Sequence, residues 1–502
     1  MNPKKVIISS KQNLQVKYGS GFDVINALLQ DLARHDLTRD IDTQIIYIDD
    51  HDSALAVGIQ SVASISQKSF KKGVDQVFDA LQPAYIVLFG SQDIVPFQEI
   101  INTTEDADSE IPSDLPYACN TAYSTDIENF TGPTRVVGRI PDIPGKADLE
   151  YVKAVIQSII DFQPSDSESL DSYFSLSTDI WQRSTHQSLN NIFGNSLGLK
   201  ISPVYMGSTP SPDLHPLIHF YNCHGSLYQP KFYGQKDNDY PEAIDSGHIE
   251  NNIRSGTIVA AECCYGAQLY NPDAVFGNHL SIANTYLGNN AIAFMGSSTI
   301  AYGPADSQGL ADLITQYFIK FMLRGYSSGR AMLEARQKFL TESGPDLDPY
   351  ELKTLAQFNL LGDPSIQVIK ENIFESRFDT VDNRRLSLFN KGTNLKATMS
   401  VSVKIDDLTE IAALKTGNDV VSAILKESGF KYGEEKEYIY SVKAKSVESV
   451  EFSKQLMGSD NVIFRTFVQK GNWISKEKAV TKVLVIKEIG DKILGSRVYH
   501  RK

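Results

Sequence analysis

The chain has 502 residues, a formal net charge of −13 and four cysteines. This length is too great for one ordinary hydrophobic core, so we expect two or three domains. Hydrophobic residues make up 41% and charged residues 22%, a balance typical of a folded globular protein rather than a disordered one. The negative charge argues against general binding to nucleic acid, because a phosphate backbone would be repelled.

The sequence predicts a cytoplasmic protein that binds no membrane. Its start, MNPKKVIISS, lacks the apolar core and the small-residue cleavage site of a secretory signal. No apolar stretch approaches the roughly 20 residues that span a bilayer. Four cysteines are too few for a disulfide scaffold, so a reducing compartment is expected.

The first 370 residues alternate between short β-rich runs and helical stretches. Strands are expected at KKVIISS, TQIIYIDD, AYIVLFGS and TRVVGRI, and then at SYFSLST, LIHFYNCHG, GTIVAAECC and NAIAFMGSS. Helices are expected over Phe22–His35, Ser61–Leu81, Ala274–Leu287, Gln308–Leu323 and Gly329–Leu340. Near-continuous apolar strands separated by helices predict an α/β fold with a mostly parallel sheet covered on both faces.

The pattern and the charge both change near residue 370. Before Glu371 there are 25 Lys+Arg and 43 Asp+Glu, a net charge of −18, and from there on 23 and 18, a net charge of +5. The strands EYIYSVKAK, NVIFRTFVQK and AVTKVLVIKE follow, with a helix near Leu408–Glu427. We therefore predict an N-terminal α/β subdomain (1–143), a catalytic α/β subdomain (144–370) and a small C-terminal α+β domain (371–502).

Two of the apolar runs end in residues suited to nucleophilic catalysis. LIHFYNCHGS ends at His224 and Gly225, and GTIVAAECCYGA ends at Cys263 and Cys264. Chemistry in a parallel sheet collects at the carboxyl ends of its strands, so an imidazole and a thiol would share one rim. A buried cysteine alone is usually just core, but the two segments together predict a thiol nucleophile with a general base. The N–H groups of Gly225 and Cys263 could form an oxyanion hole.

Five segments resemble, in the same order, segments of the gingipain family of clan CD, caspase-like cysteine peptidases. They are SDLPYA (Ser113–Ala118), VVGRIP (Val136–Pro141), CHGS (Cys223–Ser226), AIAFMGSS (Ala291–Ser298) and LLGDPSIQV (Leu360–Val368). The resemblance implies a caspase-like sheet in two subdomains and a cysteine endopeptidase with the dyad His224 and Cys263. It implies no cofactor and no metal.

The resemblance also bears on the choice between the adjacent cysteines. The family's nucleophile stands three residues before a glycine, which selects Cys263 with Gly266. Cys264 stands two residues before it, a spacing closer to caspases, and remains an alternative. Glu262 departs from the family, which usually has a small residue there, and we place Glu262 and Gly225 among the substrate-binding residues.

Specificity is predicted from Asp179 in LSTDIWQRST. It resembles the acidic residue at the floor of the primary pocket in arginine-specific members, where it would pair with Arg or Lys before the cleaved bond. Alternatively, Asp179 is the N-cap of a helix that starts at Trp181. The loop KDNDYPEA offers Asp237, Asp239 and Glu242 as calcium ligands, but such runs are usually solvated and no metal is expected.

The predicted function is cleavage of protein or peptide substrates, with restraint by a regulatory protein partner or by the C-terminal domain. Two other classes stay open. The chain could be a catalytically inactive scaffold that keeps the fold, or a cysteine-dependent acyl hydrolase or ligase that acts on non-peptide bonds.

Overall fold

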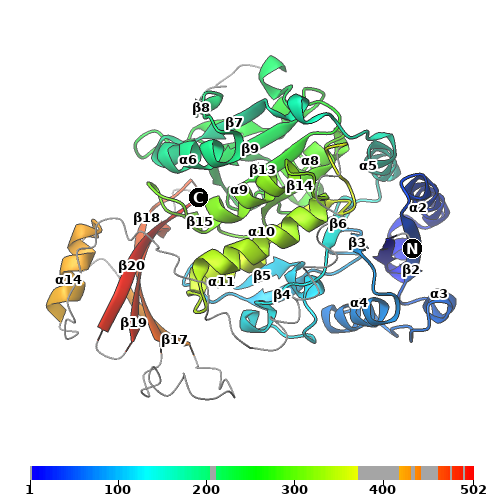
Figure 1. The fold of residues 1–502 in the computed structure, drawn as a ribbon, viewed down its shortest axis with the longest axis horizontal. Coiled ribbons are helices and arrows are strands. Elements are labelled where there is room, and N and C mark those ends of the chain that lie inside the picture. Colours follow the sequence, from blue (N-terminus) through cyan, green and yellow to red (C-terminus); the bar gives the residue numbers. More distant parts are fainter. Residues whose placement is uncertain are drawn as a thin grey trace.

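The computed structural model describes residues 3–203, 211–370, 418–430, 436–442, 462–474, 478–489 and 492–502. Within these residues, ten strands form one central sheet (Figure 1). In spatial order they are β2 (Asp42–Tyr47), β1 (Lys4–Ser9), β3 (Tyr85–Phe89), β6 (Val137–Ile140), β16 (Phe358–Gly362), β14 (Ala293–Ser297), β13 (Ile258–Ala261), β9 (Ile218–Asn222), β7 (Tyr173–Ser177) and β8 (Leu199–Ile201). The eight strands predicted before residue 370 all belong to this sheet.

The sheet is parallel within each half and changes direction once. β16 pairs parallel with β6 and antiparallel with β14, so the half from β2 to β16 runs opposite to the half from β14 to β8. Nearly every residue of the inner strands is buried, as expected for strands covered on both faces. The predicted fold class, a mostly parallel α/β sheet with a small additional antiparallel region, is confirmed.

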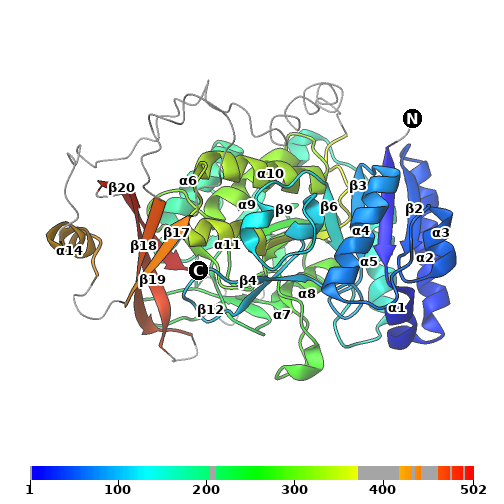
Figure 2. The ribbon, with the colours of Figure 1, turned by 90° about the horizontal axis from the view of Figure 1, so that it is seen from below.

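Helices cover both faces of this sheet. Figure 2 shows α6, α9 and α10 on one side and α7 and α8 on the other. The bounds are α1 (Lys11–Tyr18), α2 (Gly21–Leu37), α3 (His51–Ala56), α4 (Gln67–Leu81), α5 (Leu149–Asp161), α6 (Gln182–Phe193), α7 (Ser246–Ile249), α8 (Ile282–Gly288), α9 (Ala311–Met322), α10 (Ser328–Ser343), α11 (Pro349–Gln357) and α14 (Asn418–Glu427). No helix in the described ranges has the length and apolar character needed to cross a bilayer.

Three helix predictions need correction or restriction. Of the helix expected over 61–81, residues 61–66 are not helical, because α4 begins only at Gln67, capped by the Ser66 side chain. The helix expected over 274–287 is wrong in its first half, because a short 3-10 turn ends at Ala274 and α8 begins only at Ile282, capped by the Ser281 side chain. Of the helix expected over 408–427, the described part is α14, and 408–417 lie outside the described residues.

A second, antiparallel sheet carries the strands from the end of the chain. Its order is β15 (Tyr302–Gly303), β20 (Lys492–Arg501), β19 (Lys478–Ile489), β18 (Val462–Asn472) and β17 (Lys436–Val442). Three of these were predicted, whereas β20 was not. Because β15 precedes residue 370, this sheet continues onto the part of the chain that holds the candidate site. The three predicted domains and their two boundaries stay predictions.

Side chains also fix the second sheet to α11. Arg497 of β20 pairs with Glu351, and the Tyr499 hydroxyl donates to Asp348 Oδ2 at 2.9 Å. Val483 and Tyr499 belong to the same buried apolar cluster as the central sheet. β20 is therefore held against the main body along much of its length.

A buried ion pair joins the first strand to the Gly-Asp-Pro-Ser segment. Lys5 Nζ lies 2.6 Å from Asp36 Oδ2 and 2.5 Å from Asp363 Oδ2, and all three side chains are fully buried. Asp363 also accepts hydrogen bonds from the Ser365 backbone N–H at 2.9 Å and hydroxyl at 2.7 Å. The aspartate of this segment thus neutralises a buried lysine, which is a structural role.

Replacing Lys5 by alanine is expected to lower the free energy of unfolding by about 3–5 kcal/mol. The reason is that Asp36 and Asp363 would remain buried without their cation. Urea unfolding monitored by circular dichroism measures the change, and Lys68→Ala on the exposed face of α4 is the matched control. A loss no larger than that of the control would contradict the assigned role.

Candidate active site

The candidate histidine and cysteines follow two neighbouring strands. β9 and β13 pair parallel, with Ile218 opposite Ile258 and Tyr221 opposite Ala261. His224 and Gly225 form a further short strand, β10, that pairs with β11 (Lys231–Tyr233). The two strand ends therefore meet on one edge, as parallel pairing requires.

Gly225 brings the histidine segment against the cysteine segment. A Cβ atom at Gly225 would overlap the carbonyl oxygen of Cys264, so only glycine permits this approach. The residue after the candidate base is thus in backbone contact with the second of the two cysteines.

His224 is held in one tautomer by Gln235. Its Nε2 lies 2.8 Å from Gln235 Oε1, while the amide nitrogen of Gln235 donates to the carbonyl of Asp237 at 3.2 Å. Since the amide oxygen only accepts, Nε2 carries the proton and Nδ1 carries the lone pair. Nδ1 is buried and has no hydrogen-bond partner within the described part of the chain. Burial lowers the pKa of His224 to about 3, so the ring is a neutral potential base.

Three aromatic rings enclose this histidine. Its ring centroid lies 4.5 Å from that of Trp181, 4.9 Å from that of Tyr240 and 4.9 Å from that of Trp473. Trp473 follows β18, so one wall of the enclosure comes from the second sheet.

The two adjacent cysteines have different surroundings. The Cys263 thiol is buried beside Cys223, and burial raises its pKa well above the usual range. The Cys264 thiol donates a hydrogen bond to the carbonyl oxygen of Lys502 and receives one from the Ala301 N–H at 3.3 Å. Burial raises the pKa of Cys264 as well. Only Cys264 thus faces a carbonyl group of a neighbouring segment.

That segment is the last part of β20, which pairs antiparallel with β15. Arg501 lies opposite Tyr302, His500 lies opposite Gly303, and the Lys502 N–H donates to the Ala301 carbonyl at 2.9 Å. In Figure 1 the end marked C lies beside β15 and α9. Residues 500–502 therefore reach the candidate catalytic residues as an added strand.

The Lys502 side chain is fully buried among oxygen atoms. Its Nζ lies 2.8 Å from Asn222 Oδ1, 2.6 Å from Glu262 Oε2 and 2.8 Å from Asp312 Oδ1. We call these three residues the lysine site. The Trp181 ring centroid lies 5.2 Å from the same ammonium, within the range of a cation–π contact.

Two residues of this region, Glu262 and Lys502, have shifted pKa values. Burial, and to a lesser degree the neighbouring carboxylate of Asp312, raises the pKa of Glu262 to about 8. Although burial alone would lower it, the pKa of Lys502 ends above its usual value because of Asp312 and Glu262. At neutral pH burial therefore favours the protonated form of Glu262, while Lys502 keeps its charge.

The structure brings together some of the residues singled out from the sequence and separates others. His224 and Glu262 lie near residues 500–502, and Gly225 contacts the backbone of Cys264. Cys263 and Cys264 both belong to the buried core, but only the Cys264 thiol contacts Lys502, and the Cys263 thiol lies beside Cys223. Asp179 is exposed as the first residue of a 3-10 turn (Asp179–Trp181) whose N-cap is Thr178, so it is not the predicted helix N-cap. Within the described residues no contact joins Asp179 to the lysine site.

Sequence reasoning missed several residues of this region. They are Asn222, Asp312, Trp181, Gln235 and Trp473. Asn222 could have been found from the sequence, because it directly precedes the Cys-His-Gly segment. The others come from separate elements without a local pattern.

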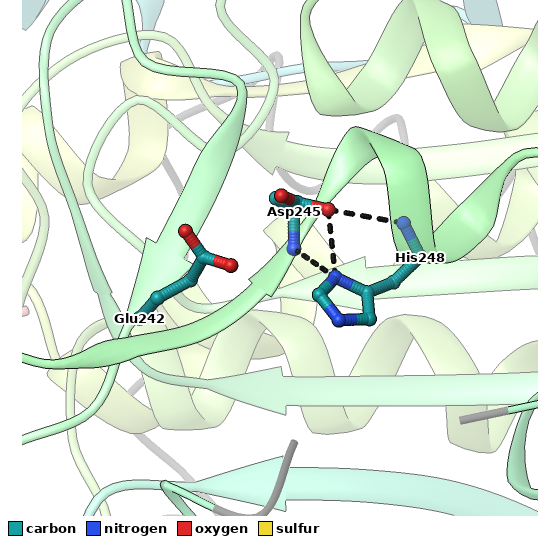
Figure 3. Close-up of side chains that lie close together, drawn as sticks. All are labelled: Glu242, Asp245 and His248. Atoms are coloured by element: carbon teal, nitrogen blue, oxygen red, sulfur yellow. Dashed lines mark hydrogen bonds and ion pairs between the residues drawn. The ribbon is translucent and has the colours of Figure 1, made fainter. Parts of the chain in front are cut away.

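The acidic loop after the candidate histidine contributes to a separate cluster, shown in Figure 3. Glu242, Asp245 and His248 offer ligand atoms that lie within 4.8 Å of one another. Asp245 caps α7 by accepting from the His248 N–H at 3.0 Å, and the His248 ring lies 2.6 Å from the same oxygen. Glu242 pairs with Lys231 at 2.6 Å. A helix cap and an ion pair account for these three side chains.

Comparisons with known proteins bear on the same region. Residues 216–369 match the model described as Peptidase family C25, and this segment contains β9, β13 and the candidate catalytic residues. A search of the curated proteins finds no match.

Two solved structures show weak likeness. A chain described as "Structure of Protease" is 11% identical with a TM-score of 0.46, over 100% of this chain and 98% of that chain. A chain of the Saccharomyces cerevisiae separase–securin complex is 12% identical with a TM-score of 0.31, over 47% of this chain and 14% of that chain. Both likenesses are too weak to support a function. Residues 216–369 nevertheless match peptidase family C25, which confirms the predicted resemblance to gingipain-type, clan CD cysteine peptidases.

Proposed function

We propose that this protein is a cysteine endopeptidase that cleaves polypeptides after lysine, with Cys264 as nucleophile and His224 as general base. One observation carries the proposal. The carbonyl oxygen of Lys502 accepts from the Cys264 thiol while the side chain of the same residue fills the lysine site. A substrate residue just before the scissile bond needs both contacts at once.

The reaction needs one proton acceptor and one nucleophile. In this proposal His224 Nδ1, which has no hydrogen-bond partner among the described residues, takes the proton from the Cys264 thiol once Lys502 has left it, and the sulfur attacks the carbonyl carbon of the substrate's lysyl residue. The C–N bond then breaks as the imidazolium returns the proton to the departing amine, which leaves a thioester on Cys264. A water molecule, deprotonated by His224, hydrolyses the thioester and restores the thiol.

Two backbone N–H groups could stabilise the oxyanion of the intermediate. They are those of Gly225 and of the nucleophile, which lie in adjoining backbone segments. With Cys264 as nucleophile, the N–H of Cys264 takes the part that the sequence assigned to Cys263. Such donors are usually a large catalytic contribution.

The lysine site favours lysine over arginine. Three oxygens between 2.6 and 2.8 Å surround one nitrogen atom, which suits the compact ammonium group with its three donors. The planar and longer guanidinium would have to displace at least one of these oxygens. We therefore expect cleavage after lysine to be faster than cleavage after arginine, which narrows the basic specificity predicted from the sequence.

A peptide library varied at the residue before the scissile bond tests the function on the full chain and on its Lys502→Ala variant, which lacks the side chain that fills the lysine site. We expect cleavage after lysine, weaker cleavage after arginine and no cleavage after acidic residues, detected by mass spectrometry of the products. Cleavage mainly after acidic or apolar residues would contradict the proposed site, because nothing at the lysine site would bind them.

A further inference from the structure

Both candidate catalytic side chains are covered by the second sheet. His224 is 2% exposed and Cys264 is 1% exposed. Trp473 packs on the His224 ring, and the guanidinium of Arg501 lies 4.2 Å from the centroid of the Trp473 ring. The last residues of β20 therefore complete a cover over the proposed nucleophile and base.

The cover binds in the way an extended substrate would. Adding a strand to an exposed sheet edge is a common mode of peptide recognition, in which the backbone gives affinity and the side chains give specificity. Here the edge is β15, the backbone contact is Lys502 N–H to Ala301 O at 2.9 Å, and the specific side chain is Lys502. A peptide and residues 500–502 cannot occupy this edge together.

The glycine of β15 is shaped for this occupant. A Cβ atom at Gly303 would overlap the Cε atom of Lys502 and would lie 2.8 Å from Asp312 Oδ2. The absence of a side chain at 303 therefore leaves the path along which a lysine stem reaches the lysine site. Any substrate lysine would have to use the same path.

We propose that residues His500–Lys502 are an intramolecular, substrate-like inhibitor, and that the peptidase becomes active when the end of β20 leaves β15. This inference rests on the proposed function. Contacts elsewhere on β20, Arg497 with Glu351 and Tyr499 with Asp348, hold the inhibitor near the site. Its effective concentration is therefore high, and a substrate in solution competes poorly against it.

The pKa shifts of the two covered residues agree with an inhibited peptidase. Burial raises the pKa of the Cys264 thiol and lowers that of His224 to about 3, so both groups favour their neutral forms. Withdrawal of β20 would readmit water and favour the thiolate. Release of the strand would thus open the binding edge and activate the nucleophile together.

The test is Lys502→Glu in the full chain, which places a carboxylate opposite Glu262 and Asp312 and should expel the end of β20. We expect kcat/KM for a short fluorogenic lysyl peptide to rise about tenfold or more, because the open site becomes more populated. Alkylation of Cys264 by iodoacetamide, followed by peptide mass spectrometry, should accelerate in parallel. Lys68→Glu on the exposed face of α4 is the charge-matched control and should leave both rates unchanged.

The possible results distinguish a failure of the proposed inhibition from a failure of the proposed peptidase activity. Equal hydrolysis and equal alkylation in folded wild type and Lys502→Glu would overturn the inhibitor while leaving the peptidase intact. Faster alkylation of Cys264 without hydrolysis in either protein would reject the peptidase, and with it the inhibitory role. If Lys502→Glu does not fold, Lys502→Ala removes the ammonium without adding a charge, and the same two rates decide.

Discussion

Replacing Cys264 by alanine is expected to lower peptide cleavage by at least about 10⁴-fold, because a dyad without its nucleophile retains only residual catalysis. Cys263→Ala is the matched variant one residue away, and it should keep activity within about tenfold of the wild type. The Cys264 thiol touches the carbonyl of Lys502, whereas the Cys263 thiol lies in the core beside Cys223. Initial rates on a lysyl peptide, measured in a released background such as Lys502→Ala, give both values.

Folding must be checked in the same experiment, since Cys263 is fully buried. Loss of its sulfur should cost about 1 kcal/mol of stability through lost packing, which thermal unfolding would show as a small shift. A folded but inactive Cys263→Ala variant, together with an active Cys264→Ala variant, would show that Cys263 is the nucleophile, as the spacing to Gly266 predicts.

The spacing to Gly266 favours Cys263 and the contacts of the thiols favour Cys264, so the choice of Cys263 stays a prediction and that of Cys264 a proposal. Counting residues to Gly266 does not say where each side chain points once the strand has ended at Ala261. The Glu262 N–H still bonds to Tyr221 O at 2.9 Å, but the chain bends at Cys263 and enters a turn at Cys264. Glu262 and Cys264 both contact Lys502, whereas the Cys263 thiol lies beside Cys223. The unusual acidic residue at 262 is explained once it is seen as part of the lysine site.

The central sheet could be predicted because its strands are continuous apolar runs. β9 and β13 are such runs, and their parallel pairing alone places His224 near the cysteines. β20 could not be predicted in the same way, because its sequence KILGSRVYHR mixes Gly495 and basic residues with few apolar ones. Its stability as a strand comes from pairing with β19 and β15, which is a property of the fold.

The same limit applies to the side chains around Lys502. Asp312 is the second residue of α9, and Gln235 lies in a loop after β11, and both are far from Cys264 in sequence. Neither belongs to a local motif, and each acquires its place only through packing of distant elements. Asp179, in contrast, sits in a segment that resembles a specificity motif, yet it is exposed, while Trp181 two residues later reaches the ammonium. Its role in specificity stays a prediction.

The second large effect is expected at the lysine site. Asp312→Asn should lower kcat/KM for a lysyl peptide at pH 7 by about 30-fold or more, because removing one partner of a buried charge pair costs roughly 2–5 kcal/mol. Asp179→Asn is the matched control, the same change at an exposed position, and should leave kcat/KM unchanged. Rates on a lysyl and a methionyl peptide, measured in the Lys502→Ala background, show whether the loss is specific for the ammonium.

Glu262→Gln should behave differently, and its pH dependence tests the charge assignment. With a pKa of about 8, Glu262 is mostly protonated at pH 7, where glutamine is a close substitute for the neutral acid. As pH rises through 8 the wild type gains a second carboxylate beside the substrate ammonium, whereas the glutamine variant does not. The wild-type to variant ratio of kcat/KM should therefore be below about tenfold at pH 7 and larger at pH 9. A ratio that is already large at pH 7 and does not change with pH would mean that Glu262 is ionised throughout.

The Asp312→Asn prediction has its own contradicting outcome. If Asp179→Asn rather than Asp312→Asn abolished the preference for lysine, the ammonium of a substrate would bind elsewhere than that of Lys502.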